Sequence, residues 1–496
     1  MTRRHRHRRQ PSPIRTRTSH GEVYDSLAVG AELKKLRFID VFAGLGGFHV
    51  ALRRLGHECV FAAEIDPGLR RVYQENFEIE PAADVRELDV ERLPDFDVLC
   101  AGFPCQPFSK AGSQKGLSCD KNGDLASLIV AWLQARRPPY FILENVPNLL
   151  KHDGGRTWRW LSRELRHAGY AVDAKVLSAH ELGVPQVRER LFIVGSRGTL
   201  EHFDWPSPES PPALLHDLLD HRPCGATAIS SRVEQALEAW QAFLDAYPKD
   251  CRKPWFPIWA AEFGATYPFA TTAPIAVPLQ MLRGYRGAFG QPLTGRKLEE
   301  LASGLPAYAR SPKPFPDWKI RFLQLNRELY EHHREWIDPW LPRLLPFEHS
   351  FQKFEWNFDD EHRSLWRTVI QLRGSGIRAK SAASAPTLVA ASSSQVPIIG
   401  WERRYMTAHE RARLQDLGEL RHLPASIGAM TRALGNAVNA RVVELVARRL
   451  LEPRNLLPND PKHLIDEEHQ SRQYPARGEH PLSPAASQLQ ALVRAS

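Results

Sequence analysis

The stretch RFIDVFAGLGGFHVALRRLGHECVFAAEID, residues 37–66, decides the fold because it reads as a strand, a glycine turn, a helix and a second strand. Its first and last parts are β-branched and apolar, as in buried strands. In α/β proteins a ligand binds at such a strand-to-helix turn, although glycine turns also serve packing alone. The glycine spacing is GxGG, which is not the GxGxxG of dinucleotide-binding proteins.

Strand-like and helix-like segments continue to alternate up to residue 205, for example in FDVLCAG, LASLIVAWLQARR, YFILENV, TWRWLSRELRHAG and RLFIVGS. Repeated units of this kind predict an α/β fold with a doubly wound, mostly parallel sheet. The proline-rich WPSPESPP at residues 205–212 is a plausible linker. The pattern beyond it is irregular up to about residue 400, yet ten of the thirteen tryptophans follow residue 200, which indicates a second core.

Length and composition narrow the class of protein. A chain of 496 residues exceeds one comfortable core, so we expect two domains and tails. Six cysteines without a CxxC pair favour a reducing compartment, and we expect no metal site. No long apolar run or signal peptide is visible, which predicts a soluble intracellular protein. Residues 1–20 carry seven arginines and no acid, so most of the net charge of +9 lies in this tail, which we expect to be disordered and to touch phosphates non-specifically.

The segment GFPCQPFSKAG, residues 102–112, holds Cys105 in a turn directly after the strand-like DFDVLCA. Prolines on both sides stiffen the turn and glycines at both ends let it pivot. A thiol placed there suits a nucleophile, and a buried structural thiol is the alternative.

Acidic residues follow two of the predicted strands. Glu64 in AEID stands at the tip of the second strand, where an acid can grip ribose hydroxyls. Asp84 in ADVREL is expected to end the third strand and to suit an amino group. Together they predict a cofactor that carries a nucleoside, and solvated acids at strand ends are the alternative.

Further polar residues flank later strands. Glu144 and Asn145 in FILENV follow an apolar run, where burial would raise the pKa of the carboxyl group and suit it to act as an acid. A surface glutamate is the ordinary alternative. Arg188 and Arg190 in GVPQVRERLFIVG are two residues apart, so they share a face and can hold carboxylates, phosphates or base oxygens, or form a structural ion pair.

The order of FAGLGG, GFPCQPFS, ENV, QVRER, RYMTAHERARLQ and GNAVNA closely resembles the DNA (cytosine-5) methyltransferase family of bacterial or phage restriction-modification type. The resemblance covers residues 37–197 and 401–450. It implies an S-adenosylmethionine-dependent methyltransferase fold with a second, irregular target-recognition domain. It also implies transfer of a methyl group from S-adenosyl-L-methionine to C5 of a flipped-out cytosine in a specific double-stranded DNA sequence, through a Cys105 adduct at C6.

The resemblance also implies roles for single residues. Cys105 is the nucleophile, Glu144 the acid that engages the cytosine, Arg190 a contact to the base, and Arg188 a support for the thiol and the carboxylate. The cofactor pocket comprises Phe42, Gly44, Leu45, Gly46, Gly47, Glu64, Ile65, Asp84, Val85, Pro104, Leu125 and Asn436. The DNA contacts are Gln106 and Ser109 around the vacated base and Thr387 of TLVA on the backbone.

The DNA-reading candidates lie in LRGSGIRAK, residues 372–380. Its glycines give the backbone freedom to enter a groove, and its cations offer charge and guanine contacts. A solvated basic loop is the alternative, because phosphate contacts outnumber base contacts. The cations are Arg373, Arg378 and Lys380.

The implied organisation divides the chain into five parts. These are a basic tail (1–36), a catalytic and cofactor-binding domain (37–205), a target-recognition domain with the return segment (206–429), a helix that packs back on the catalytic domain (430–452) and a second disordered tail (453–496). We expect a cytoplasmic, nucleoid-associated bacterial monomer whose partners are double-stranded DNA and a restriction endonuclease acting independently on the same site, with no membrane contact.

Two segments depart from the family pattern. DKNGDLAS stands where DxRGxLF is usual, so that Gly123 and Leu125 match while the arginine and the phenylalanine do not. RLQDLGEL replaces RLQGFP. Neither change touches the reacting groups.

Three other functions fit the sequence less well. An RNA cytosine-5 methyltransferase of the same fold would not need the large region 206–400. A non-catalytic DNA-binding homologue should have lost Cys105, Glu144 or Arg190, and all three are present. A nicotinamide oxidoreductase would need the GxGxxG spacing.

Overall fold

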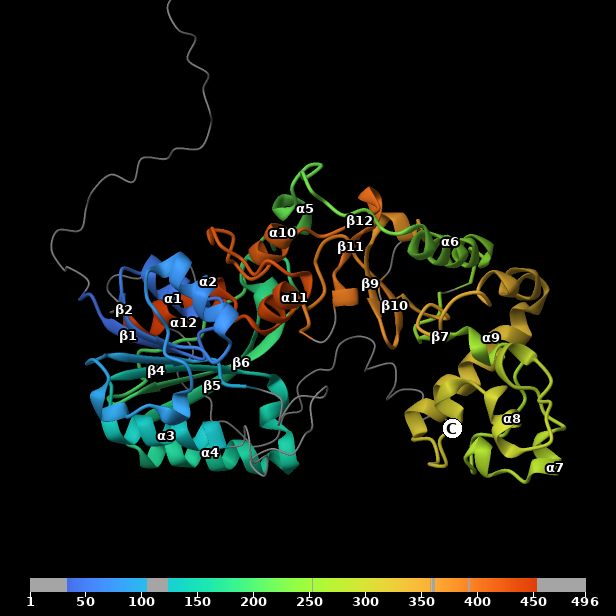
Figure 1. The fold of residues 1–496 in the computed structure, drawn as a ribbon, viewed down its shortest axis with the longest axis horizontal. Coiled ribbons are helices and arrows are strands. Elements are labelled where there is room, and N and C mark those ends of the chain that lie inside the picture. The colour runs from blue at the N-terminus through green and yellow to red at the C-terminus, as the bar shows by residue number, and fades with distance from the viewer. Residues whose placement is uncertain are drawn as a thin grey trace, which may run out of the picture.

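The computed structural model contains two groups of elements, each built on its own six-stranded sheet (Figure 1). Cys105, Gln106, Ser109 and nearly all of both predicted tails lie outside the residues that the structure describes. The described residues are 34–104, 124–251, 253–356, 358, 362–390 and 393–452.

The first sheet has the strand order β2-β1-β3-β4-β6-β5. Neighbours among β1 to β4 are parallel, whereas β6 runs antiparallel to both β4 and β5. The strands are β1 (Arg37–Val41), β2 (Glu58–Ala63), β3 (Val98–Ala101), β4 (Tyr140–Asn145), β5 (Ala171–Ser178) and β6 (Glu189–Ser196).

Helices cover both faces of this sheet (Figure 1). One face carries α1 (Gly47–Arg54) and α2 (Pro67–Phe77), and the other carries α3 (Asp124–Arg136) and α4 (Arg156–His167). Successive strand residues enter different cores: Phe38 packs on the α1 side and Ile39 on the α3 side. Because both faces are buried, the strands read as continuous apolar runs.

The secondary structure differs from the prediction at Asp84 and at β5. Asp84 does not end a strand: the preceding segment makes a single bridge, from Ala82 to Ala63, and Asp84 then begins the short 3-10 helix Val85–Glu87. The strand β5 was not predicted, because AVDAKVLS alternates half-buried and exposed residues and pairs only with β6, at one edge of the sheet.

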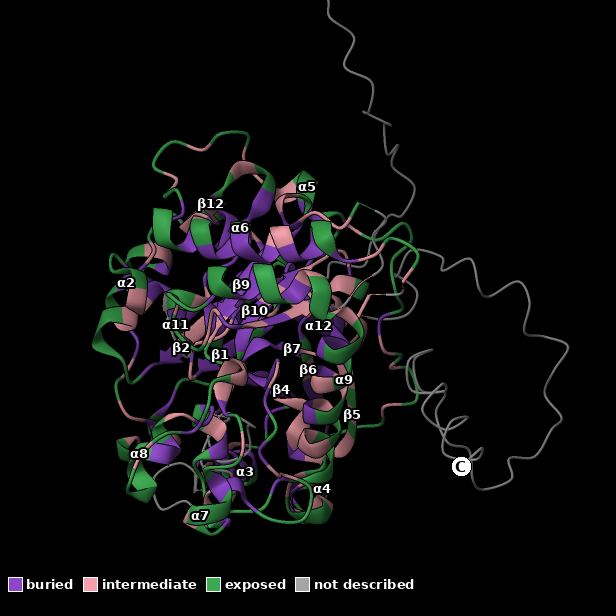
Figure 2. Ribbon diagram, turned by 90° about the vertical axis from the view of Figure 1, so that its right-hand side faces the viewer, coloured by how far each residue is buried: buried purple, intermediate pink, exposed green. Residues whose placement is uncertain are grey.

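The chain returns to the first sheet after the second group of elements. Met406 and residues of α10 (Ala408–Arg413), α11 (Ile427–Asn436) and α12 (Ala440–Leu451) are buried in the core on the α1 side. Figure 2 shows how much of this region is buried. The C-terminal helices therefore complete the first core.

The second sheet has the order β12-β11-β9-β10-β8-β7 and consists of short strands. Its core is rich in tryptophan: Trp240 and Trp340 are buried, and their Nε1 atoms donate to the backbone carbonyls of Phe351 and Ala239, both over 2.7 Å. The strands are β7 (Ile258–Trp259), β8 (Lys353–Trp356), β9 (Val369–Arg373), β10 (Gly376–Lys380), β11 (Ile398–Ile399) and β12 (Arg404–Tyr405).

Helices α6 to α9 accompany the second sheet (Figure 1). They are α6 (Ser231–Ala246), α7 (Leu279–Leu282), α8 (Leu298–Ser303) and α9 (Asp317–Trp340). Over the described part of the chain, none of the helices has the length and apolar character needed to cross a bilayer.

Candidate active site

A cavity lies at the ends of β1, β2 and β3, with about 400 Å³ of empty space, part of it open to solvent. The structure brings together there many of the residues predicted to bind a cofactor, and it adds three that were not predicted. The predicted ones are Phe42, Glu64, Ile65, Asp84, Val85, Pro104 and Leu125, and the additional ones are Ala63, Ala83 and Arg86, each a sequence neighbour of a predicted residue.

Glu64 is fixed directly after β2 by two backbone donors. The N–H of Gly44 donates to Oε2 over 2.8 Å, and the N–H of Asp66 donates to Oε1 over 2.9 Å. Burial raises the pKa of the Glu64 carboxyl group above its usual value. Each carboxylate oxygen keeps a further acceptor site, so Glu64 can also accept bonds from a pair of ligand hydroxyls.

The glycine turn has two different structural roles. A Cβ atom on Gly46 would lie 2.4 Å from Phe77, and one on Gly47 would lie 2.4 Å from the carbonyl oxygen of Val438. These two glycines therefore serve close packing, the alternative that the sequence left open. A Cβ on Gly44 would meet nothing nearer than 4.0 Å, so Gly44 leaves open space beside Glu64. Five of the residues predicted to bind the cofactor do not line the cavity: Gly44, Leu45, Gly46, Gly47 and Asn436.

Asp84 is already paired within the protein. Nε of Arg86 donates to its two carboxylate oxygens over 2.9 and 3.0 Å, and these bonds hold the pKa of the Asp84 carboxyl group below its usual value. Phe42, on the same cavity, has a left-handed backbone with φ of 61°, which is uncommon for a bulky residue. Such strain gathers at functional sites.

Glu144 occupies the end of β4 and is almost fully buried, with 8% of its side chain exposed. Nε of Arg190 lies 3.0 Å from Oε1, yet this oxygen has no well-aligned hydrogen bond within the described residues. Burial raises the pKa of the Glu144 carboxyl group, and the charges of Arg190 and Arg188 oppose the rise. Glu144 is therefore paired with Arg190, whereas the resemblance assigned the support of the carboxylate to Arg188 and the contact with the base to Arg190.

The segment that leads to Cys105 lies against the end of β4. A Cβ on Gly102 would lie 3.8 Å from Oε2 of Glu144. Nδ2 of Asn145 donates to the carbonyl oxygen of Phe103 over 3.3 Å. Because Pro104 lines the cavity as well, this short segment joins the cavity to Glu144.

Arg188 is buried and holds distant parts of the chain together. Its guanidinium donates to the carbonyl oxygens of Leu388, Gly435 and Ala437 over 2.9 to 3.0 Å. Arg188 therefore acts on Glu144 by its charge, while its guanidinium group donates to backbone atoms 200 or more residues away in sequence.

The predicted DNA contacts that the structure describes lie on two segments. The hydroxyl group of Thr387 donates to the carbonyl oxygen of Val187, next to Arg188. Arg373, Arg378 and Lys380 lie on the antiparallel hairpin of β9 and β10 rather than on a loop without regular structure.

The doubly wound sheet, the cavity at its strand ends and the buried acid beside it define an α/β protein with a ligand-sized cavity next to a buried carboxyl group. Residues 36–244 match the family described as C-5 cytosine-specific DNA methylase. The chain belongs to this family, as the sequence predicted, and its fold is the methyltransferase fold with a second domain.

Three relatives illustrate the similarity. The Type II methyltransferase M.HhaI of Haemophilus parahaemolyticus is 40% identical over 190 residues, which are 38% of this chain and 58% of the relative. M.DsaV of Dactylococcopsis salina is 41% identical over 192 residues, 38% of this chain and 54% of the relative. M.AluI of Cellulosimicrobium cellulans is 30% identical over 481 residues, 84% of this chain and 91% of the relative. The chain thus spans little more than half of the first two relatives and nearly all of the third.

Proposed function

We propose that this protein is a DNA (cytosine-5-)-methyltransferase that modifies one cytosine within a specific double-stranded sequence. The observation that carries the proposal is the buried Glu144, with Arg190 at 3.0 Å on one side and the segment leading to Cys105 on the other. An acid held in this way can donate a proton to a base, and a thiol close by can attack it.

The cavity fits S-adenosyl-L-methionine. Glu64 offers acceptors for ribose hydroxyls, as argued above. Ile65 is an exposed apolar side chain on the cavity, 62% accessible, which suits the face of an adenine ring. When bound, S-adenosylmethionine supplies an electrophilic methyl group. Asp84 would accept from the adenine amino group only with the acceptor sites that Arg86 leaves.

The protein's own groups make the cytosine reactive. C5 of cytosine is a poor nucleophile, so the Cys105 thiolate adds to C6 while the Glu144 carboxyl group donates its proton to N3. The new S–C6 bond converts C5 into an enamine-like carbon. After methylation, the C5 proton leaves to water, the thiolate is expelled from C6 and N3 returns its proton to the Glu144 carboxylate, which restores the aromatic ring and the enzyme. A cysteine suits both steps, because its thiolate is a good nucleophile and a good leaving group.

Arg190 and Arg188 support this chemistry differently. Arg190 lies beside Glu144 and has 20% of its side chain exposed, so its remaining donors can contact the base. Arg188 keeps a positive charge near Glu144, and its bonds to Leu388 and Gly435 hold the surrounding backbone in place.

The substrate must present its cytosine outside the helix, because C5 and C6 are inaccessible in stacked DNA; flipping the base costs a few kcal/mol. Gln106 and Ser109 would contact the duplex at the vacated position, and Thr387 its backbone. We place sequence choice in residues 206–400, with the hairpin cations at the DNA. The partners are this duplex and a restriction endonuclease that acts independently on the same site.

The test is a transfer assay with S-adenosylmethionine labelled in its methyl group, followed by 5-methylcytosine sequencing of DNA from cells that express the protein. We expect label in double-stranded DNA, at one cytosine of a short recurring motif. Label that enters RNA instead of DNA, or DNA without 5-methylcytosine, would contradict the proposal.

A further inference from the structure

Strands β8, β9 and β10 present two unlike faces. One face is apolar and packs in the tryptophan-rich core, through residues such as Phe354, Ile370 and Ile377. Alternate residues share the opposite face. We call its polar residues the polar face: Lys353, Glu355, Gln371, Arg373, Arg378 and Lys380. Val369 lies on the same side and is buried in the core on the α1 side, and the Lys353 ammonium group lies over the rings of Trp259 and Tyr308. The other three cations, Arg373, Arg378 and Lys380, outnumber the single carboxylate, which is a charge balance that suits DNA.

Strand pairing places the carboxylate beside one arginine. Arg378 on β10 lies opposite Glu355 on β8 and opposite Gln371 on β9. Figure 1 shows β9 and β10 between the elements of the first sheet and helices α7 to α9. The side chains of Arg378 and Glu355 are 26% and 21% exposed, so the pair is partly shielded from solvent.

The pair is bidentate and engages one side of the guanidinium group. Nε of Arg378 donates to Oε2 of Glu355 over 2.7 Å, and Nη2 donates to Oε1 over 2.8 Å. Nη1 makes no hydrogen bond within the described residues. Because a guanidinium group has five N–H donors, the two hydrogens of Nη1 and the second hydrogen of Nη2 remain available.

These remaining donors form a fork at the end of the side chain. Two parallel donors of this kind match the O6 and N7 acceptors of guanine in the major groove. Glu355 holds Nε and Nη2, so the plane of the fork is set before DNA arrives.

The neighbouring Arg373 is engaged differently. Its Nη2 donates to the Ser375 hydroxyl over 2.6 Å, and its Nη1 lies 3.5 Å from Oε2 of Glu355. Both terminal nitrogens therefore have contacts within the protein, which leaves Arg373 a weaker candidate for a bidentate contact than Arg378.

We propose that Glu355 is a positioning residue for sequence recognition and that it orients Arg378 to read one guanine of the methylated sequence. The proposal rests on the proposed function, since it assigns the DNA-reading group of the same enzyme. It also explains how a carboxylate can lie at the centre of the polar face. An unpaired acid there would repel phosphates, whereas Glu355 is neutralised by Arg378.

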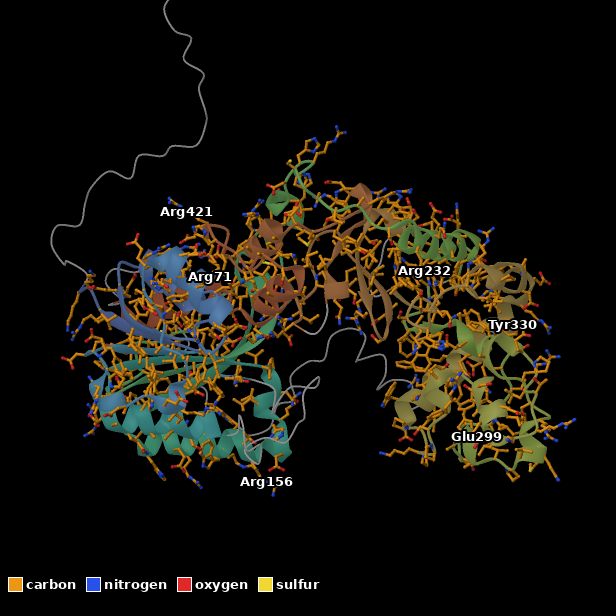
Figure 3. The ribbon with its side chains drawn as sticks, in the orientation of Figure 1. Arg71, Arg156, Arg232, Glu299, Tyr330 and Arg421 are labelled. Atoms are coloured by element: carbon orange, nitrogen blue, oxygen red, sulfur yellow. The ribbon has the colours of Figure 1, made fainter. Side chains whose placement is uncertain are left out.

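The test compares the variants Glu355→Gln, Arg378→Ala and their combination by 5-methylcytosine sequencing. Each single variant should relax the motif at the same guanine, with a loss of discrimination of roughly 5- to 150-fold. The combined variant should relax it no further, because both changes remove one contact. Glu348→Gln is the matched control: Glu348 pairs with Arg232 over 2.8 Å on the same half of the molecule, and Figure 3 labels Arg232.

A binding experiment adds a readout that a loss of stability would not produce. Duplexes carrying 7-deazaguanine lack the N7 acceptor at one chosen position. The unmodified protein should bind such a duplex more weakly when the substitution falls on the guanine read by Arg378, and Arg378→Ala should lose that sensitivity.

Distinct results separate the possible failures. A wild-type protein that produces no 5-methylcytosine would overturn the proposed function and this inference with it. Wild-type methylation together with an unchanged motif in both single variants would overturn this inference alone. An even loss of methylation at all sequences would also overturn this inference alone. So would a motif that the control variant Glu348→Gln relaxes as well.

Discussion

Asn145 donates from Nδ2 to the backbone carbonyl oxygen of Phe103 over 3.3 Å, and Phe103 lies two residues before Cys105. The bond joins the end of β4, which carries Glu144, to the segment that carries the proposed nucleophile. Asn145 is buried, and its Oδ1 accepts from the N–H of Val146 over 2.9 Å. The position of Glu144 relative to Phe103, two residues before Cys105 in sequence, therefore depends on this amide.

Replacing Asn145 by alanine should impair catalysis more than cofactor binding. The change leaves a buried donor and a buried acceptor without partners, which costs about 1–3 kcal/mol each. A shift of about 1 Å between reacting groups lowers rates by roughly 10²-fold. Single-turnover rates and calorimetric cofactor affinity measure the two effects.

Asn76→Ala is the matched control. The Asn76 side chain bridges α2 to residues 421 and 422 through hydrogen bonds of 2.8 to 3.0 Å, far from the proposed nucleophile in sequence. It should lower the unfolding temperature without a comparable loss of rate. Equal rate losses in both variants would mean that the Asn145 amide acts only through stability.

Replacing Cys105 by serine should abolish methyl transfer and leave DNA binding intact. The two side chains are similar in size, but a serine hydroxyl is not ionised near neutral pH and adds poorly to C6. The labelled-methyl assay and a DNA-binding titration check this. Turnover near that of the wild type would remove Cys105 from the mechanism.

Replacing Glu144 by glutamine should lower turnover by roughly 10²- to 10⁴-fold, the usual contribution of a general acid. Cofactor affinity should change little, because Glu144 is not among the residues that line the cofactor cavity. Calorimetry with S-adenosylmethionine provides the comparison. A variant that loses cofactor affinity would show that Glu144 serves the pocket.

The same variant should also alter how stability depends on pH. Burial raises the pKa of Glu144 in the folded protein, so above the unfolded pKa of about 4.3 the folded state binds more protons at this group than the unfolded state. The contribution of Glu144 to the free energy of unfolding therefore falls as pH rises towards the folded pKa. Glutamine does not titrate, so the variant does not show this pH-dependent decrease. The unfolding temperature of the variant minus that of the wild type should be higher at about pH 8 than at about pH 5. The same difference at both pH values would contradict the raised pKa of Glu144.

Replacing Glu64 by alanine should weaken cofactor binding and spare the rate at saturating cofactor. Hydrogen bonds to a charged group contribute about 1.5–3 kcal/mol, which corresponds to roughly 10- to 150-fold in affinity. Glu87→Ala is the control, since Glu87 is exposed and does not line the cavity. A normal affinity in Glu64→Ala would exclude the proposed ribose contact.

Local signals made the first sheet and its helices predictable. Helix α2 begins at the capping signal in its sequence. Asp66 caps the helix by accepting from the N–H groups of Gly68 and Leu69, and Pro67 occupies the first turn. The strands of the second sheet carry weaker signals. They are two to five residues long, and β7 pairs with β8 across more than ninety residues of chain. The alternation in KFEW, VIQLR and GIRAK covers only four or five residues, and the strands β7, β11 and β12 have two residues each, so these signals are weak without the surrounding fold.

In the candidate site too, features set by neighbouring residues in sequence were easier to predict than contacts between distant residues. Glu64 and Glu144 could be predicted because each comes directly after an apolar run, Glu64 just beyond β2 and Glu144 at the end of β4. The partners of Arg188 could not, because Leu388 and Gly435 are 200 and 247 residues away in sequence. The pairing of Asp84 with Arg86 was also missed, although the two residues are neighbours, since rotamers decide it.

The three carbonyl oxygens that accept hydrogen bonds from Arg188 limit where a chimera with a relative can be joined. Two of them, on Gly435 and Ala437, belong to the C-terminal return, and the third belongs to Leu388 at the end of the recognition region. A graft that replaced residue 388 with a differently placed backbone would bury a guanidinium group without one of its acceptors. Exchanges of DNA specificity should therefore cross over before Ala385, whose backbone pairs with Pro185 and Val187, and keep everything after it from one parent.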